Sequence, residues 1–328
     1  MAAALNHVEE YPDPEYRELR RGLANYWQVA EKQLVLGNGA SELILGIIRT
    51  LAPKTCMVTA PCYSGYETAL NAAAPSCRIH RIPLRAEDDF TLPENICQEI
   101  ARVKPNLLIL TNPNNPNGKR ISANRLREIA DACRAAGTVL LMDECFLALS
   151  GGDADSLIHC IRSEALPAVV LRAFTKTFAI PGVRLGYAVC SGSPAARIQR
   201  ELPEWNLSVF AQYAGRAAFG NVMRETPAPE TSAGGTSGYL AASVEMIARE
   251  REFLSEELEK LGFRVFPSDA NYILFQSRDR ELHRKLLDKR ILIRDCRDYH
   301  GLTAGFYRAA VRTRRENTAL LRCLRNIK

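Results

Sequence analysis

The chain has 328 residues, of which 47% are hydrophobic and 24% are charged, and its formal net charge is +6. This composition is typical of a globular protein that buries a substantial core, and the length predicts about two domains. The basic excess is spread along the chain, and no apolar run approaches the roughly 18 residues of a membrane helix. We therefore expect no nucleic-acid or membrane partner, whereas an anionic small molecule would suit the charge.

The first two thirds of the chain alternate between predicted helices and strands. Apolar residues at helical spacing predict helices over 42–51, 66–74 and 124–137. Apolar runs predict strands over 55–61, 77–84, 105–113, 138–144 and 168–176. This alternation indicates an α/β fold in which helices cover both faces of a mostly parallel sheet. In such a sheet the ligand lies at the carboxyl ends of the strands.

A change in composition marks the predicted domain boundary. The segment RETPAPETSAGGTSG, residues 224–238, is rich in Pro, Gly, Ser and Thr and predicts a loop. A long charged helix over 239–262 follows, then four short strands, a helix between them and a terminal helix. We therefore expect three parts, namely an N-terminal segment at the dimer and domain interface, a large domain and a smaller C-terminal α/β domain, over 1–30, 31–222 and 223–328.

The cysteines and the first residues bear on the compartment. Ten cysteines are scattered singly, without a C-x-x-C pair or the Cys/His spacing of a zinc site. We expect free, mostly buried thiols and no metal. The opening stretch MAAALNHVEE is too polar for a signal peptide, so a cytoplasmic location is expected.

Polar side chains follow three of the predicted strands. The turn NPNNPNG follows one strand, Asp143 ends the next, and Lys176 ends a third, with Arg184 eight residues later. Alone, such a lysine most often extends past the rim of a core, and such an aspartate caps a helix. Together they supply what a phosphorylated pyridine aldehyde needs: an amine for a Schiff base, a carboxylate for the ring nitrogen, an amide donor and a guanidinium for the phosphate.

The same segments resemble those of fold-type I pyridoxal-phosphate enzymes of the class I/II aminotransferase family, over almost the whole chain. NPNNPNG resembles the family turn N-P-x-N-P-T-G, DECF resembles D-E-A-[FY], and FTKTFAIPGVRLGY resembles the lysine segment. The resemblance implies pyridoxal 5'-phosphate as the cofactor. It also implies that Lys176 forms the Schiff base and that Asp143 is the partner of the pyridine nitrogen.

Further cofactor contacts are implied by the same resemblance. Asn115 would donate to the ring oxygen, and Arg184 would bind the phosphate. The hydroxyl of Thr175 would remain as a phosphate contact, although Ala173 stands where relatives usually carry Ser or Thr.

GNGASEL resembles the phosphate-binding turn at a helix start, which implicates Gly39, Ala40 and Ser41. It lacks the third glycine of G-x-G-x-x-G, so a dinucleotide site is not expected. Tyr63 in APCYSGY would stack on the cofactor ring. Tyr11 in YPDPEYRELR resembles a tyrosine that reaches the neighbouring subunit's phosphate, which implies a homodimer.

Two branches of the family share these motifs. Histidinol-phosphate aminotransferases usually carry Tyr where this chain has Phe146, whereas the threonine-phosphate decarboxylases of cobalamin synthesis usually carry Phe. The tail LIRDCRDYHGL…YRAAVRT also resembles the decarboxylases, which implies that Arg294 and Arg308 bind the phosphate and carboxylate of the substrate. We expect a lyase that decarboxylates a small phosphorylated amino acid such as O-phosphothreonine. A histidinol-phosphate-type aminotransferase and a non-catalytic cofactor-binding regulator stay open as alternatives.

Overall fold

The computed structural model describes residues 2–163, 166–192, 194–223 and 236–327. Seven strands form one sheet in the spatial order β1-β7-β6-β5-β4-β2-β3. Strand β7 runs antiparallel to both of its neighbours, and the remaining pairs are parallel, which confirms the predicted mostly parallel sheet. The strands are β1 (Leu34–Gly37), β2 (Thr55–Ala60), β3 (Arg78–Pro83), β4 (Leu107–Thr111), β5 (Val139–Asp143), β6 (Ala168–Ala173) and β7 (Gly186–Cys190).

Burial explains why the central strands are almost uninterrupted apolar runs. Every residue of β4 and β6 is buried, because helices cover both faces of the sheet. One face packs against α2 (Arg17–Trp27), α5 (Ile96–Val103), α6 (Ala123–Ala136) and α7 (Ile158–Ser163). The other face packs against α3 (Ala40–Leu51), α4 (Gly65–Ala73) and α9 (Pro194–Arg200).

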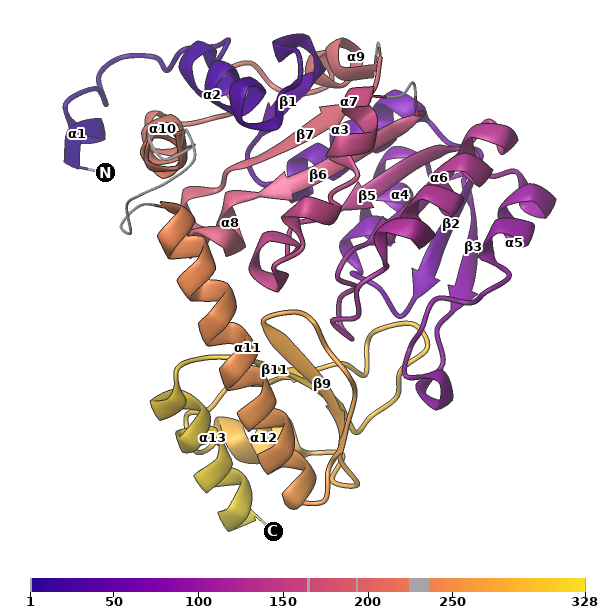
Figure 1. Ribbon diagram of the computed structural model, residues 1–328, viewed down its shortest axis with the longest axis vertical. Coiled ribbons are helices and arrows are strands. Elements are labelled where there is room, and N and C mark those ends of the chain that lie inside the picture. Colours follow the sequence, from indigo (N-terminus) through magenta and orange to yellow (C-terminus); the bar gives the residue numbers. More distant parts are fainter. Residues whose placement is uncertain (1, 164–165, 193, 224–235, 328) are drawn as a thin grey trace.

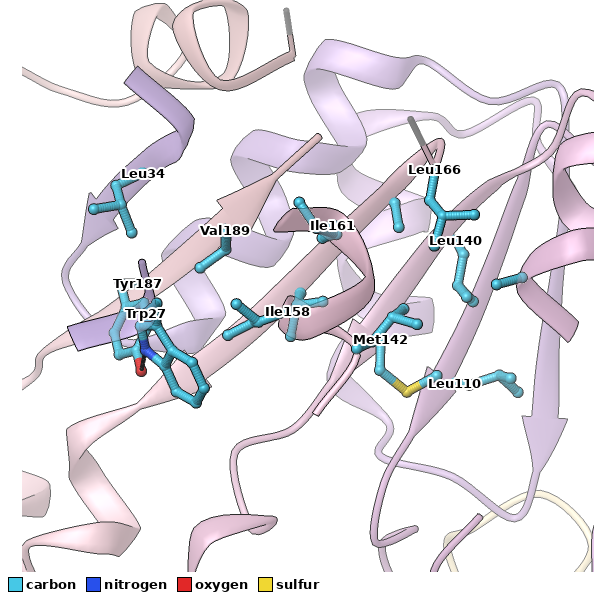
Figure 2. Close-up of a cluster of buried hydrophobic side chains, with 14 of the residues drawn as sticks. Trp27, Leu34, Leu110, Leu140, Met142, Ile158, Ile161, Leu166, Tyr187 and Val189 are labelled. Carbon is cyan, nitrogen blue, oxygen red and sulfur yellow. Dashed lines mark hydrogen bonds between the residues drawn. The ribbon is translucent and has the colours of Figure 1, made fainter. Parts of the chain in front are cut away.

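Figure 2 shows part of the first of these two cores. Ile158 of α7 lies with Met142 and Val189 of the sheet, and Trp27 lies at the margin of the cluster. The indole nitrogen of Trp27 donates a hydrogen bond of 2.8 Å to the hydroxyl of Tyr187. The polar atom of each ring is therefore satisfied although both side chains are buried.

A second, antiparallel sheet lies in the C-terminal part, in the order β10-β11-β9-β8. Its strands are β8 (Arg264–Val265), β9 (Tyr272–Gln276), β10 (Arg294–Asp295) and β11 (Phe306–Ala310). One face packs against three helices, α11 (Thr236–Lys260), α12 (Leu282–Leu287) and α13 (Arg314–Ile327). Figure 1 shows α11 running from the large sheet down to this smaller unit.

The other face of the small sheet packs against the large domain. Phe266 and Phe306 contact Phe90 there, with ring centroids 4.9 Å and 6.1 Å from the Phe90 ring. Side chains alternate along a strand, so Arg308, two residues after Phe306, also faces the large domain. This alternation brings a cation from the small domain to the carboxyl edge of the large sheet.

The remaining elements are short or lie at the surface. They are α1 (Ala2–Leu5), α8 (Phe174–Thr177), α10 (Val209–Met223) and the 3-10 turns η1 (Glu31–Gln33), η2 (Ala86–Asp88), η3 (Ala148–Ser150), η4 (Asp153–Asp155) and η5 (Pro181–Val183). Most of the predicted loop over 224–238 lies outside the described residues, and its last three residues begin α11. None of the ten cysteines forms a disulfide bond, as predicted. None of the helices in the described ranges is long and apolar enough to cross a membrane.

Candidate active site

Asp143 is a buried carboxylate at the end of β5, held by two hydrogen-bond donors. The hydroxyl of Tyr66, on α4, donates to Oδ2 at 2.6 Å, and the backbone N–H of Cys145 donates to Oδ1 at 2.9 Å. Burial, and then the adjacent Asp143 charge, raises the pKa of Tyr66 well above its ordinary value, so its phenol keeps the proton that it donates. Each carboxylate oxygen has a further lone pair free of these contacts, so Asp143 can accept one more donor.

Lys176 lies one helical turn beyond the strand, not at the strand end that the sequence predicted. Strand β6 ends at Ala173, and Lys176 is the third residue of α8. The N–H of Phe174 still donates to the carbonyl of Leu185 at 3.1 Å, which extends the β6–β7 pairing by one residue, and its ring is buried. The apolar run continues through Phe174 for this reason, although the strand has ended.

The charges around Lys176 favour its neutral form. Loss of water around the ammonium, followed by the positive charges of Arg308 and Arg184, lowers the pKa of Lys176. The residue is nevertheless partly open to solvent, so the amine is accessible to a ligand. Its Nζ lies 5.7 Å from the centroid of the Phe146 ring. A neutral, accessible amine is what attack on an aldehyde requires.

An anion cradle forms where α3 begins beside Arg184. Gly39 precedes the helix with a φ of 82°, and a Cβ there would lie 2.6 Å from Nη2 of Arg184. A Cβ at Gly186, the first residue of β7, would lie 3.0 Å from the backbone nitrogen of Ala40. Ala40 and Ser41 open the helix, where N–H groups have no partner within the helix. Glycine thus permits the close approach of a guanidinium and a helix N-terminus, a combination that suits a phosphate.

Residues of both domains meet at Asn115. Asn115 is buried, and its Oδ1 accepts hydrogen bonds from Nη1 of Arg308 and, at 3.4 Å, from the hydroxyl of Tyr299. Arg294 is the cross-strand partner of Arg308. Its guanidinium carbon lies 5.6 Å from the centroid of the Tyr299 ring, and its Nη2 lies 2.5 Å from a carboxylate oxygen of Asp298. Arg308 of the small sheet therefore contacts the amide of the large domain, and Arg294 lies beside Arg308 on the neighbouring strand.

The other predicted residues divide into two groups. Tyr63 packs edge-on against Tyr66, with ring centroids 5.4 Å apart, and Thr175 precedes Lys176 on α8. Both therefore lie beside the residues already described. Tyr11 instead lies on the surface with 82% of its area exposed, and its ring centroid is 5.1 Å from that of Trp205.

Three tyrosines belong to this site although the sequence did not single them out. Tyr66 holds Asp143, Tyr299 contacts Asn115, and Tyr272 lies with its ring centroid 5.0 Å from the guanidinium carbon of Arg308. Tyr66 could have been found, because it follows Tyr63 by only three residues, and its N–H donates to the carbonyl of Tyr63 in the turn that leads into α4. Tyr299 stands within the tail that carried the resemblance, but nothing in the sequence distinguishes its hydroxyl contact.

The donor set fits pyridoxal 5'-phosphate. An accessible amine, a buried carboxylate with a free lone pair, an amide and an anion cradle surround the same edge of the sheet. The amine, carboxylate and cradle match the aldehyde, the ring nitrogen and the phosphate of that molecule.

Comparison with known proteins agrees with this fit. Residues 2–324 match the family model described as aminotransferase class I and II. The chain is 34% identical to the threonine-phosphate decarboxylase of Salmonella typhimurium, over 98% of this chain and 84% of that protein. It is 31% identical to the histidinol-phosphate aminotransferase of Caldanaerobacter subterraneus subsp. tengcongensis, over 98% and 85%. The crystal structure of the histidinol-phosphate aminotransferase from Clostridium acetobutylicum has a TM-score of 0.86 at 27% identity and covers 99% of this chain and 92% of that one. The chain therefore belongs to the class I and II aminotransferase family.

Proposed function

We propose that this chain is a pyridoxal-phosphate-dependent lyase that decarboxylates a small phosphorylated amino acid, with O-phosphothreonine as the expected substrate. The observation that carries the proposal is the pairing of Arg294 and Arg308 across β10 and β11, beside Asn115. A phosphorylated amino acid presents two anionic groups. Each guanidinium can bind one of them through two parallel hydrogen bonds.

The chain supplies a residue for each part of the cofactor. When bound, pyridoxal 5'-phosphate supplies an electron sink for the substrate α-carbon. Asp143 would keep the ring nitrogen protonated by its charge, and Asn115 would donate to the ring oxygen. Lys176 would hold the cofactor through its amine, and Tyr63 would stack on the ring. The phosphate would bind at Gly39, Ala40, Ser41, Thr175 and Arg184.

The position of the substrate carboxylate decides the reaction. In decarboxylation the bond from the α-carbon to the carboxylate carbon breaks, carbon dioxide leaves, and a proton takes its place. Only the α-carbon bond perpendicular to the cofactor ring is weakened by the electron sink. Arg308 would hold the carboxylate and Arg294 the phosphate, so these two contacts would set which bond is perpendicular.

A histidinol-phosphate-type aminotransferase is the second candidate. It is supported by the 31% identity to such an enzyme over 98% of this chain. Phe146 favours the decarboxylase, because its ring lies near Lys176 where the aminotransferases usually carry Tyr. A cofactor-binding regulator without catalysis is the third candidate.

We also propose a cytoplasmic homodimer. The exposed Tyr11 supports the dimer, because a ring with 82% of its area open is available to a second subunit. The ten cysteines, none of which forms a disulfide bond, support the location, because thiols stay reduced in the cytoplasm.

One experiment separates the three candidates. The cofactor-loaded protein is incubated in parallel with O-phosphothreonine, O-phosphoserine and histidinol phosphate, and release of carbon dioxide and transfer of the amino group to 2-oxoglutarate are measured separately. We expect carbon dioxide from O-phosphothreonine without amino transfer. Amino transfer without carbon dioxide would establish the aminotransferase, and cofactor binding with neither product would favour the regulator.

A further inference from the structure

We infer that Tyr299 is a positioning residue with two separate contacts: its hydroxyl fixes the amide of Asn115, and its ring supports Arg294. The role of the second contact rests on the proposed function, because Arg294 is expected to bind the substrate phosphate. The first concerns the cofactor alone and does not depend on which substrate is used.

Tyr299 lies in the loop between β10 and β11, and the residues that follow it in this loop contact the large domain. Tyr299 is 7% exposed. The next residue, His300, places Nε2 3.3 Å from Oε2 of Glu67, on α4. A Cβ at Gly301, whose φ is 87°, would lie 3.3 Å from the carbonyl oxygen of Ala60. Contacts from the large domain therefore determine where the phenol lies.

The amide of Asn115 has only one orientation that satisfies its neighbours. A guanidinium has donors and no acceptor, so the atom that faces Arg308 must be Oδ1. The hydroxyl of Tyr299 donates to the same oxygen at 3.4 Å. With both donors on the oxygen, Nδ2 is the end of the amide that is left for an acceptor such as the cofactor ring oxygen. Burial raises the pKa of Tyr299, which keeps the donated proton on the phenol.

The ring of Tyr299 contacts a different partner. The guanidinium carbon of Arg294 lies 5.6 Å from the ring centroid, within the range of a cation–π contact. Asp298 binds the same guanidinium at 2.5 Å. Arg294 is thus held by a ring and a carboxylate beside its cross-strand partner Arg308. Loss of the hydroxyl leaves this contact intact, whereas loss of the ring removes it.

Two substitutions separate the two contacts. Tyr299→Phe removes only the hydroxyl, and Tyr299→Ala removes the ring as well. Tyr307→Phe is the matched control, because Tyr307 donates to the carbonyl of Asp279 at 2.9 Å and packs in the helix-covered core of the small domain. It removes the hydrogen bonds of another tyrosine hydroxyl of the same domain, including the one accepted from the N–H of Leu282 at 3.2 Å, without touching Asn115.

The hydroxyl is tested without any substrate. Cofactor affinity of the apoprotein and the pH midpoint of the visible absorbance of the loaded protein are measured. A donor to the ring oxygen stabilises its negative charge, so a less well-held Asn115 should move the midpoint to higher pH. We expect Tyr299→Phe to do so and to weaken cofactor binding by roughly threefold to tenfold, the effect of one hydrogen bond. An unchanged pH midpoint and cofactor affinity in Tyr299→Phe, or equal changes in Tyr307→Phe, would overturn the proposed role of the hydroxyl.

The ring is tested by calorimetric titration of the loaded protein with O-phosphothreonine and with threonine. Asp143→Asn is introduced into every protein, the wild-type reference included, so that turnover is too slow to consume the ligand during the titration. Tyr299→Phe should bind O-phosphothreonine within about twofold of wild type, whereas Tyr299→Ala should bind it roughly fivefold or more weakly. Threonine binding should differ little between the two variants. Equal O-phosphothreonine affinities for Phe and Ala would overturn the ring's role. Absence of O-phosphothreonine binding to wild type would overturn it together with the proposed function, while the absorbance result would still decide the role of the hydroxyl.

Discussion

At the scale of single residues, the positive charges beside Lys176 should govern its reactivity. Because Arg308 lowers the pKa of Lys176, removing that cation should raise it. The amine reacts only when neutral, so the pH profile of covalent cofactor capture should move to higher pH in Arg308→Gln. The rate is measured by borohydride trapping and mass spectrometry across a pH series. Lys176→Ala should trap no cofactor at that position.

Arg312→Gln is the matched control for this shift. Arg312 is exposed and paired with Glu316 at 2.6 Å, at the end of the same strand region. Its removal changes the net charge equally but leaves the surroundings of Lys176 intact. A profile that moves as far in Arg312→Gln as in Arg308→Gln would show a general effect of charge and not a local one.

Asp143 should act through its charge. In Asp143→Asn the amide oxygen can still accept from the N–H of Cys145. The amide nitrogen can donate to the hydroxyl of Tyr66, which then accepts a hydrogen bond where it donated one before. The variant should therefore fold and bind cofactor. It cannot hold a pyridinium proton by charge, so kcat should fall by roughly a hundredfold or more.

Tyr66→Phe gives the comparison, because it keeps the charge and removes one hydrogen bond to it. Its kcat should fall by only about tenfold, the effect of one hydrogen bond. Circular dichroism and cofactor absorbance check folding and loading of both variants. An Asn variant with a near-normal kcat would mean that another acid serves the ring nitrogen.

At the scale of elements, the start of α3 offers a paired test of the anion cradle. Gly39→Ala places a Cβ against Arg184 at a φ of 82°. Gly137→Ala, at the end of α6, has a similar φ of 67° and meets nothing within 4 Å. Gly137→Ala should lose about 1 kcal/mol of unfolding free energy, because alanine disfavours the left-handed helical backbone at that position. Gly39→Ala should lose more, because its φ of 82° with a ψ of 170° is essentially restricted to glycine.

The two glycine variants should differ in cofactor binding. Only Gly39→Ala should weaken it, by roughly tenfold or more, because only there does the new methyl group displace the guanidinium that would bind the phosphate. Fluorescence titration of the apoproteins measures the affinity, and urea unfolding measures the stability. Equal cofactor affinities would place the phosphate elsewhere.

The elements that the sequence predicts correctly are those that depend on the residues of one short segment. The runs of β4 and β6 are apolar because both faces of the sheet are covered, and the sequence alone predicts them. The predicted end of β6 was wrong by one turn, because Phe174 is buried like a strand residue but its carbonyl accepts from the N–H of Phe178 at 3.0 Å and so begins a helical turn. The antiparallel direction of β7 likewise depends on the path of the chain between β6 and β7.

At the scale of the whole molecule, the site joins distant parts of one chain. Asn115 and Arg308 are 193 residues apart and meet through a hydrogen bond, and Phe90 packs against Phe306 beside them. The motifs in the sequence predict that each of these polar residues belongs to the site. It could not predict the contact of Tyr299 with Asn115, because no periodicity relates residues 184 positions apart.

Tyr11 raises the question of which site it serves. Its ring is 82% exposed and packs against Trp205, so its proposed contact with a cofactor phosphate calls for a second subunit. In a symmetric dimer each subunit would then lend Tyr11 to the other's site. A dimer is expected in sedimentation analysis. The decisive question is whether Tyr11 and Lys176 of one site come from different chains.

Co-expression of Tyr11→Ala and Lys176→Ala subunits answers it. In a mixed dimer, Lys176 of the first subunit would meet Tyr11 of the second, so one site would be intact and the other would lack both residues. Random pairing should therefore restore about one quarter of wild-type activity at limiting cofactor. If Tyr11 served its own subunit, each site of a mixed dimer would lack one of the two residues, and activity would stay at the level of the Tyr11→Ala sites alone. Mixing the separately purified variants just before the assay is the control, since exchange between stable dimers is slow.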